Sequence, residues 1–231
     1  MTRRALAAWS VVLVALVPGT AWLPAPARAG DPVKDLVRKV EARSQKTTDL
    51  TAEFSQSTDI KGFAKPLQSS GRVYIKRPGK LRWDYLAPTL EQIFVDEDKV
   101  QFYIPEHKQV MVGQLSKLAN SQAPLQLLQG IGRLDSHYHV TAAPDGAKGH
   151  GGLPLLSLTL PDGSSDHPRI VVEVDPGSYF LRRVELHDVN GNVSTFTFSA
   201  IRANTGLKNT LFEFTVPQDV EVVNAPTLAV P

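Results

Sequence analysis

Apolar and polar residues follow two different periods along the chain, and the change falls near residue 50. From Val33 to Val40, apolar residues recur every three or four positions, which is the spacing of one helix face. Asp31 can accept hydrogen bonds as an N-cap, and the proline after it suits a first helical turn. The pattern therefore predicts an amphipathic helix over residues 31–44 that packs one face against a core.

Beyond residue 50, apolar and polar residues alternate as they do along a half-buried β-strand. Turn-forming residues such as Pro78-Gly79 and Asn190-Gly191 separate the alternating runs. The runs predict about eleven strands, from 51–59 near the start to 211–215 near the end. Short strands at regular spacing favour a single antiparallel sheet that curls toward a barrel.

Residues 113–131 interrupt the alternation and predict two short helices, the second opened by Pro124. The apolar residues of these two helices are Leu115, Leu118, Leu125, Leu127 and Leu128. Strand-like alternation resumes near residue 137, so the interruption is local and gives no sign of a domain boundary.

The first 29 residues have the layout of a secretory signal peptide. Arg3 and Arg4 give a positive start, residues 5–17 form an apolar run, and Ala27-Arg28-Ala29 is a small-x-small cleavage signal. The alternative is a transmembrane anchor, but the run is shorter than the roughly 20 residues that a membrane span needs. We expect cleavage after Ala29 and a single domain over residues 30–231, outside the cytoplasm.

Composition narrows the possible functions. The 231 residues are 42% hydrophobic, which is enough for one core, and none is a cysteine, which excludes disulfides, thiolate metal sites and a cysteine nucleophile. Residues 1–29 carry three arginines and no acid, so without them Lys and Arg fall from 25 to 22 against 23 Asp and Glu. The net charge then changes from +2 to −1. A near-neutral chain does not favour nucleic-acid binding, which needs a basic surface.

The sequence contains no catalytic or nucleotide-binding motif of the GxSxG, HExxH, P-loop or GxGxxG type. His137 and His139 fall on one face of a predicted strand, where they would form a metal pair or be ordinary surface or packing histidines. The second interpretation is simpler, because no third ligand lies nearby in the sequence. The acidic triplet 96–98 fits a hairpin loop better than a metal site. We therefore expect no enzyme activity, no metal and no cofactor.

The segment 71–85 is the most informative about function. Because side chains alternate across a strand, the apolar residues of each of its two strands share one face. These faces consist of Val73, Ile75 and Arg77 on the first strand and Leu81, Trp83 and Tyr85 on the second. If the apolar faces point inward, Arg77 points inward too, and a buried guanidinium needs acceptors. The alternative places Arg77 at the rim, in water, before the Pro78-Gly79 turn.

Several motifs extend beyond this segment and together resemble those of one family. The most specific is Gly71-x-x-x-x-Lys76-Arg77-Pro78, followed by Arg82-Trp83. Further matches are Phe54-Ser-Gln56, Pro88, Phe102-Tyr103, Pro105, Gln109, Pro124-Leu-Gln-Leu-Leu128, Phe212-Glu-Phe214, Pro217, Val220 and Val222. With these motifs the chain resembles the LolA family, the periplasmic carriers of outer-membrane lipoproteins, over nearly all of residues 30–231.

The resemblance implies a mainly β (α+β) fold, an incomplete antiparallel β-barrel with a helical lid. The lid corresponds to residues 115–128, and the cavity between sheet and lid is expected to take up acyl chains. Arg77 aligns with the arginine that, in this family, bonds to backbone carbonyls of the lid and keeps the empty carrier closed. The cavity residues expected on this basis are Phe54, Val73, Ile75, Leu81, Trp83, Tyr85, Phe94 and Phe102.

The resemblance also implies a function and partners. The protein would be a monomeric chaperone that takes lipoproteins released from the inner membrane to the outer membrane. Its partners would be acylated lipoproteins, the inner-membrane lipoprotein-releasing ABC transporter and an outer-membrane acceptor lipoprotein. A periplasmic lipid-sensing regulator that binds a membrane anti-sigma partner has a related fold and stays open as the alternative, although such regulators usually add a second domain.

Overall fold

The computed structural model describes residues 31–117, 125, 127–128, 131–160 and 169–224. The strands are β1 (Asp49–Asp59), β2 (Leu67–Lys76), β3 (Lys80–Ala87), β4 (Glu91–Asp96), β5 (Lys99–Ile104), β6 (Gln109–Gln114), β7 (His139–Ala142), β8 (Leu156–Thr159), β9 (Arg169–Val174), β10 (Leu181–His187), β11 (Val193–Ala203) and β12 (Glu221–Asn224). The helices are α1 (Pro32–Gln45) and α3 (Leu134–His137), with 3-10 turns η1 (Pro105–His107), η2 (Leu115–Lys117), η4 (Ile131–Arg133), η5 (Pro144–Gly146), η6 (His150–Gly152) and η7 (Asn209–Phe212).

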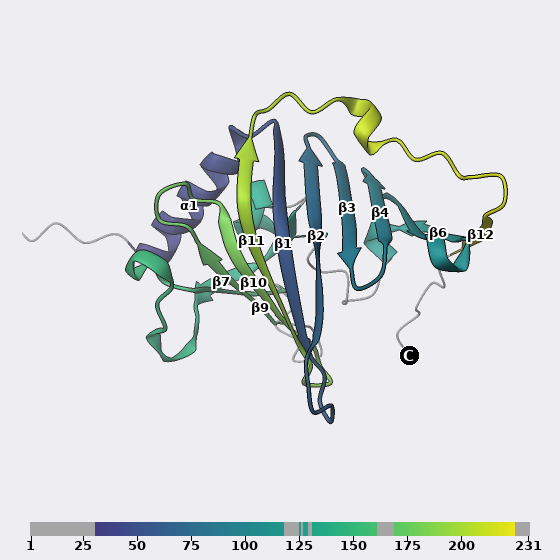
Figure 1. Cartoon of the computed structure of the whole chain (residues 1–231). Coiled ribbons are helices and arrows are strands. Elements are labelled where there is room, and N and C mark those ends of the chain that lie inside the picture. The colour runs from purple at the N-terminus through teal and green to yellow at the C-terminus, as the bar shows by residue number, and fades with distance from the viewer. Residues whose placement is uncertain (1–30, 118–124, 126, 129–130, 161–168, 225–231) are drawn as a thin grey trace, which may run out of the picture.

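All twelve strands belong to one sheet, in the order β12-β6-β5-β4-β3-β2-β1-β11-β10-β9-β8-β7 (Figure 1). Neighbouring strands are antiparallel except β12 and β6, which are parallel. The sheet is open and strongly curved. The mainly β fold and the incomplete barrel predicted from the sequence are therefore confirmed, with twelve strands where about eleven were expected.

Helix α1 begins as the sequence predicts. The Asp31 side chain accepts a hydrogen bond from the backbone N–H of Val33 at 2.9 Å, and Pro32 occupies the first turn. The helix buries Leu36, Val37 and Val40 on one face. None of the helices among the described residues combines the length and the apolar composition that crossing a bilayer requires.

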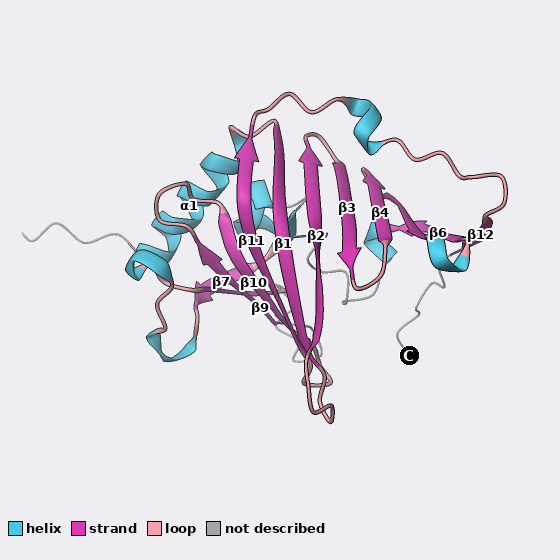
Figure 2. Ribbon diagram, in the orientation of Figure 1, coloured by secondary structure: helices cyan, strands magenta, loops and turns pink. Residues whose placement is uncertain are grey.

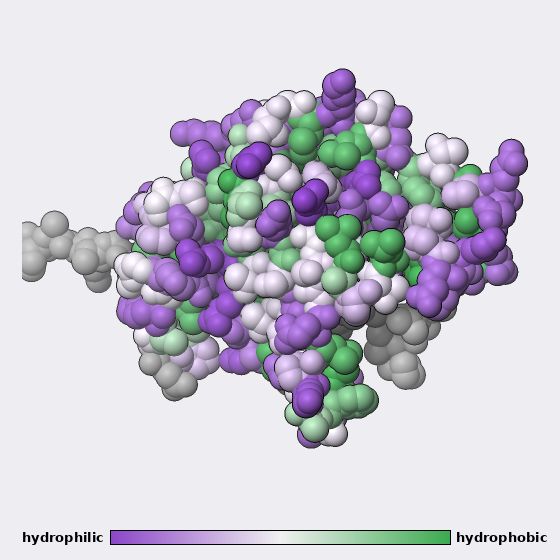
Figure 3. Space-filling model, in the orientation of Figure 1, coloured by the Kyte–Doolittle hydropathy of each residue, from purple (hydrophilic) through white to green (hydrophobic). Residues whose placement is uncertain are grey.

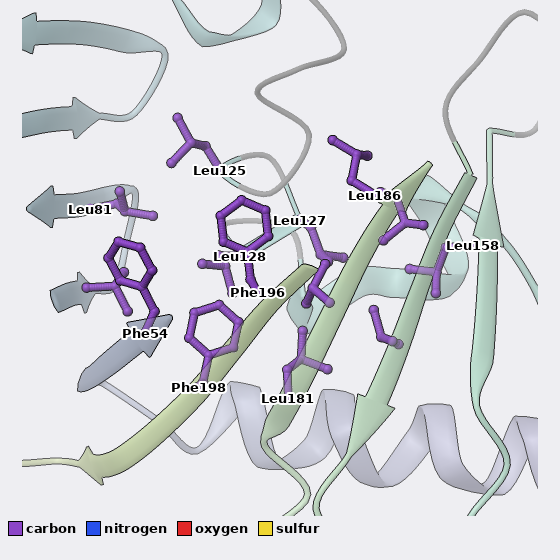
Figure 4. Packing of buried hydrophobic residues seen from close by; sticks show 14 of the residues in the cluster. Phe54, Leu81, Leu125, Leu127, Leu128, Leu158, Leu181, Leu186, Phe196 and Phe198 are labelled. Atoms are coloured by element: carbon purple, nitrogen blue, oxygen red, sulfur yellow. The ribbon is translucent and has the colours of Figure 1, made fainter. Parts of the chain in front are cut away.

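The core lies on the concave side of the sheet, between the strands and the helices (Figure 2). Cross-strand register brings inward-facing residues together: Val73 pairs with Trp83, and Trp83 pairs with Ile93. The apolar face of α1 belongs to the same cluster. Phenylalanines of β1 and β11 and leucines of β3, β8, β10 and the lid point toward one another in this core (Figure 4). Burial of these side chains supplies the main driving force for folding.

Gly71 in β2 allows a close approach between two strands. A Cβ atom at this position would lie 1.9 Å from the backbone oxygen of Asp84 and 2.9 Å from the ring of Phe54. Gly71 is paired with Phe54 in the ladder, so the aromatic ring covers the space that a side chain would fill. This contact explains why the motif beginning at Gly71 needs glycine.

Residues 204–220, which we call the C-terminal strap, pass over one end of the convex side of the sheet. The strap leaves the end of β11 and runs past the upper ends of the strands to β12 (Figure 1). Its carbonyl groups accept hydrogen bonds from the sheet: Leu207 O from Lys76 Nζ at 2.5 Å, and Leu211 O from Arg82 Nη1 at 3.2 Å. The Phe214 ring stacks on Phe94, with 4.8 Å between the ring centroids.

The prediction of a strand at 211–215 is wrong. Residues 209–212 form the turn η7, and Glu213 to Thr215 belong to no strand. The alternation of Phe212 and Phe214 arises because their side chains pack on the sheet, rather than because the backbone joins a ladder. The last strand is instead β12, which pairs with β6 in parallel and which the sequence pattern did not reveal.

The strand predicted to begin at His137 is also different in the structure. His137 ends helix α3, and its Nδ1 lies 2.9 Å from the backbone oxygen of Arg133. Strand β7 starts only at His139. The two histidines therefore do not share a strand face, and the pairing considered from the sequence is wrong.

Replacing Gly71 by alanine is expected to destabilise the protein by about 3 kcal/mol, because the new Cβ has no room beside the Asp84 carbonyl. Urea unfolding measures this free energy. Gly177→Ala is the matched control, since the nearest atom to its Cβ would lie at an ordinary 3.5 Å. Equal stabilities for the two variants would contradict this explanation of Gly71.

Candidate functional site

A cavity of about 60 Å³ lies in the core where α1, β1, β2 and β11 meet the lid. Its lining is mainly apolar and includes Val40, Leu50, Ala52, Val73, Ile75, Leu128, Ile131, Leu181, Phe198 and Ile201. Sites that enclose a small molecule have volumes of about 300–1,000 Å³. The cavity is therefore too small to hold an acyl chain by itself.

Arg77 stands at the edge of this cavity, just beyond the end of β2. Its Nη2 donates a hydrogen bond to Ser44 Oγ at 2.5 Å, and its backbone N–H donates to the Thr48 carbonyl at 2.8 Å. The side chain is half-buried. Burial lowers the pKa of the guanidinium, but arginine stays charged at any pH that a folded protein tolerates.

On the other side of Arg77 is a much larger, open hollow of about 890 Å³. Its lining is more polar and includes Gln45, Pro78, Glu97, Asp98, Ser116, Gly132, Arg133 and His137. Gln45 spans part of it, with Nε2 donating to the Gly132 carbonyl at 3.3 Å. Because Arg77 lines both spaces, its guanidinium forms part of the boundary between the apolar core and the open hollow.

An aromatic cluster lies beside the cavity on the concave face. The ring centroid of Trp83 is 4.7 Å from that of Phe54, 5.6 Å from that of Phe196 and 6.2 Å from that of Phe198. Trp83 is buried, and its Nε1 has no hydrogen-bond partner among the described residues. A buried indole N–H in this position is unusual, because it has lost its hydrogen bonds to water without replacement.

Tyr85 closes the aromatic cluster on the side of Gln56. Its hydroxyl group donates to Gln56 Oε1 at 3.0 Å. Burial, together with the negative charge of Glu91, raises the pKa of the Tyr85 phenol well above its ordinary value. Tyr85 is therefore a neutral donor at any physiological pH.

Most of the residues that the sequence placed at the cavity come together in the structure. Val73, Ile75 and Arg77 line the cavity directly. Phe54, Leu81 and Trp83 are buried in the same core, and the half-buried Tyr85 and Phe102 pack against it. That these residues receive acyl chains stays a prediction.

Phe94 was also expected to line the cavity, but it lies on the other face of the sheet. It follows Ile93 on β4 and points to the opposite, convex face, where the Arg82 guanidinium lies 5.2 Å from its ring centroid. The Phe94 ring is buried because Phe214 of the strap covers it. The expectation that Phe94 lines the cavity is wrong, and burial under the strap explains why this residue is aromatic.

The leucines predicted to form the lid lie in the core, except Leu118, whose position the structure does not describe. Leu115, Leu125, Leu127 and Leu128 are buried in the core cluster. Leu118 lies outside the residues that the structure describes. Among the described residues, the acceptor for the Arg77 guanidinium is Ser44 on α1 rather than a backbone carbonyl of the lid. The inward orientation of Arg77 is thus favoured over the rim, with a partner that the sequence analysis did not propose.

Several residues at the cavity were missed from the sequence. They are Ser44 on α1, Tyr179 and Phe180 just before β10, Leu181 at the start of β10, and Phe198 on β11. Ser44 follows Val40 by four positions, so it continues the apolar stripe of the helix. A small polar residue on an otherwise apolar helix face was the signal that could have identified it.

Asp49 fixes the start of β1 beside the cavity. Its carboxylate accepts hydrogen bonds from Thr205 N at 2.8 Å, Thr205 Oγ1 at 3.0 Å and Gly206 N at 3.1 Å. Burial alone would raise the pKa of Asp49, but these hydrogen bonds, with a further one from Thr48, lower it below the ordinary value. The carboxylate therefore ties the cavity wall to the first residues of the C-terminal strap.

Because the folded-state pKa of Asp49 is lowered, its stabilising effect is present above the unfolded-state pKa of about 3.9 and is lost as the pH falls below it. Asp49→Asn should lower the free energy of unfolding at pH 7, and the difference from the wild type should shrink toward pH 3. Asp59→Asn, at the exposed end of the same strand, is the control. A difference that does not change with pH would contradict this role.

Comparison with known proteins assigns the family. Residues 45–215 match the family described as "Outer membrane lipoprotein carrier protein LolA". An outer-membrane lipoprotein carrier protein of Dechloromonas aromatica (strain RCB) is 32% identical over 205 residues, covering 88% of this chain and 92% of that protein. One from Xanthomonas oryzae pv. oryzae (strain MAFF 311018) is 35% identical over 178 residues, covering 75% and 81%.

A solved structure shares the fold. An uncharacterized conserved protein from Thermus thermophilus superposes with a TM-score of 0.54 at 14% sequence identity, covering 84% of this chain and all of that one. The sequence matches extend through the curved sheet and the segments that face the cavity. On this evidence, the chain belongs to the LolA family of outer membrane lipoprotein carrier proteins.

Proposed function

We propose that this protein is a periplasmic chaperone that carries acylated lipoproteins from the inner membrane to the outer membrane. The observation that carries the proposal is the position of Arg77 between an apolar core and an open hollow. The relatives named as outer-membrane lipoprotein carriers support it. They favour the carrier over the lipid-sensing regulator that the sequence left open.

Residues 1–29 act in this proposal as a signal peptide that exports the chain to the periplasm. The mature protein then begins at Gly30 and works as a monomer without catalysis. Its partners are acylated lipoproteins, an inner-membrane lipoprotein-releasing ABC transporter that loads it, and an outer-membrane acceptor lipoprotein that unloads it.

The physical problem of such a carrier is the cost of exposing acyl chains to water. Each buried methylene group gains about 0.8 kcal/mol, so a lipid anchor does not cross an aqueous compartment unprotected. The apolar concave face offers shelter, and the small lid segments that cover it are easier to displace than a second sheet. A carrier that only sheltered the chains would never release them, so its affinity must also be limited.

Arg77 supplies this limit. In the closed form its guanidinium bonds to Ser44 and so joins the end of β2 to α1 at the edge of the cavity. Acyl chains need more space than the closed cavity offers, so loading moves α1 and the lid away from the sheet and breaks this hydrogen bond. The lost stabilisation lowers the net affinity for cargo. Hydrogen bonds to a charged group are worth about 1.5–3 kcal/mol, which corresponds to a factor of roughly ten to a hundred in affinity.

Arg77→Leu should load lipoprotein normally but release it at least about ten-fold less well, because the closed form is no longer favoured. A transfer assay from the purified complex to outer-membrane vesicles measures release. Arg72→Leu is the matched control, because Arg72 is an exposed arginine on β2, the strand that ends just before Arg77. If Arg77→Leu releases cargo as fast as the wild type, Arg77 does not limit affinity.

Trp83 gives a direct test of cargo entry. It is the only tryptophan after residue 29, and it is buried in the aromatic cluster. We expect its fluorescence to change when an acylated peptide is added, because loading must alter the packing around the indole. The same peptide without its acyl chain is the control. An unchanged spectrum at a peptide concentration shown by another method to bind would remove Trp83 from the binding site.

A further inference from the structure

Exposed apolar side chains gather at one end of the sheet, away from the lid. Among the described residues, Phe63 is 68% exposed, Leu67 54% and Val189 59%. Phe63 belongs to the β1–β2 connection, Leu67 is the first residue of β2, and Val189 belongs to the β10–β11 turn. We call residues 60–67 and 188–192 together the apolar tip. The space-filling view shows apolar surface at this lower end of the molecule (Figure 3).

The two turns of the apolar tip support each other. Strands β1 and β11 are paired, and Asp59 lies opposite Val193, so their connections leave the sheet together. The backbone N–H of Lys61 donates to Asn192 Oδ1 at 3.0 Å. Asp188 in turn accepts from the backbone N–H of Asn190 at 2.9 Å and of Asn192 at 2.8 Å. Phe63 is therefore presented on an ordered hairpin.

The charge around Phe63 is arranged with the cations outward. Lys61 and Lys65 lie two positions to either side of Phe63, and both are exposed. The nearby acids are Asp59, at the end of β1, and Asp188. The Asp188 carboxylate is already satisfied by hydrogen bonds within its own turn. The outer part of the hairpin thus combines an aromatic side chain with two exposed cationic groups.

The apolar tip is separate from the cavity boundary. Strand β2 runs from Leu67 at the tip to Lys76, the residue before Arg77, and has ten residues. At about 3.3 Å per residue the two ends are roughly 30 Å apart. Contacts made by the tip therefore leave Arg77 and the open hollow free.

We propose that the apolar tip is a membrane-contact site, which inserts Phe63, Leu67 and Val189 into the headgroup region of an anionic bilayer. An aromatic residue flanked by lysines suits this interface, because the ring enters the acyl boundary while the ammonium groups meet anionic headgroups. The tip projects from the sheet as a narrow end, which favours a lipid surface over a folded protein partner. This proposal rests on the proposed function in one respect: a carrier between two membranes must approach both.

The mature chain, without cargo, is tested for binding to vesicles of phosphatidylethanolamine and phosphatidylglycerol by co-sedimentation. Phe63→Ser should lower the partition coefficient about ten-fold, because the largest inserted side chain is lost. The double variant Lys61→Gln/Lys65→Gln should lower it about five-fold per lysine on anionic vesicles and hardly at all on phosphatidylcholine. High salt should have the same effect as the lysine changes.

Val222→Ser is the matched control, since Val222 is 55% exposed but lies on β12, outside the apolar tip. It should bind vesicles like the wild type. Wild-type protein that does not sediment with anionic vesicles, or Phe63→Ser that sediments equally well, would overturn the proposal. The first result would point to a protein partner at the tip.

The same variants separate this proposal from the carrier function. Phe63→Ser should retain the Trp83 fluorescence response to an acylated peptide, because residue 63 is outside the core. If the wild type binds vesicles but neither the wild type nor any variant responds to the acylated peptide, the proposed carrier function is wrong. The proposed membrane contact is then retained. If the peptide response is intact and vesicle binding is absent, only the membrane contact fails.

Discussion

The half-buried charge of Arg77 is the constraint on which the proposed carrier mechanism depends. A guanidinium that has lost part of its hydration needs acceptors, and its described side-chain partner is a neutral hydroxyl group on α1. A neutral acceptor compensates for lost hydration less completely than a carboxylate would. An interaction of this intermediate strength is what the reversible opening proposed above requires.

The two faces of the sheet differ in how they are covered. On the concave face, α1 and short lid segments cover a continuous apolar surface with a small void beside Arg77. On the convex face, the C-terminal strap is fixed by hydrogen bonds to Lys76 and Arg82 and by the Phe214 stack. The strap thus covers only one end of the outer face, whereas the inner face is covered by α1 and the short lid segments.

The sequence was sufficient to predict an element and its inward face wherever one side of that element is apolar and the other polar. Helix α1 and the Gly71–Tyr85 hairpin were predictable for this reason, including the inward face of Val73 and Trp83. Phe94 was misplaced because β4 reads Ile93-Phe94-Val95 and is buried on both faces, so alternation gives no direction. Strand β12 and the strap depend on contacts between residues far apart in sequence, which no local pattern records.

The parallel pairing of β12 with β6 has a mechanical consequence. It joins one edge of the sheet to a segment whose other end is held at Asp49 and β11, so the strap connects the two ends of the strands in between. Because the strap passes over the convex side, curling the sheet further would lengthen the strap's path and stretch it. The strap therefore resists a tighter curl of the strands that it spans.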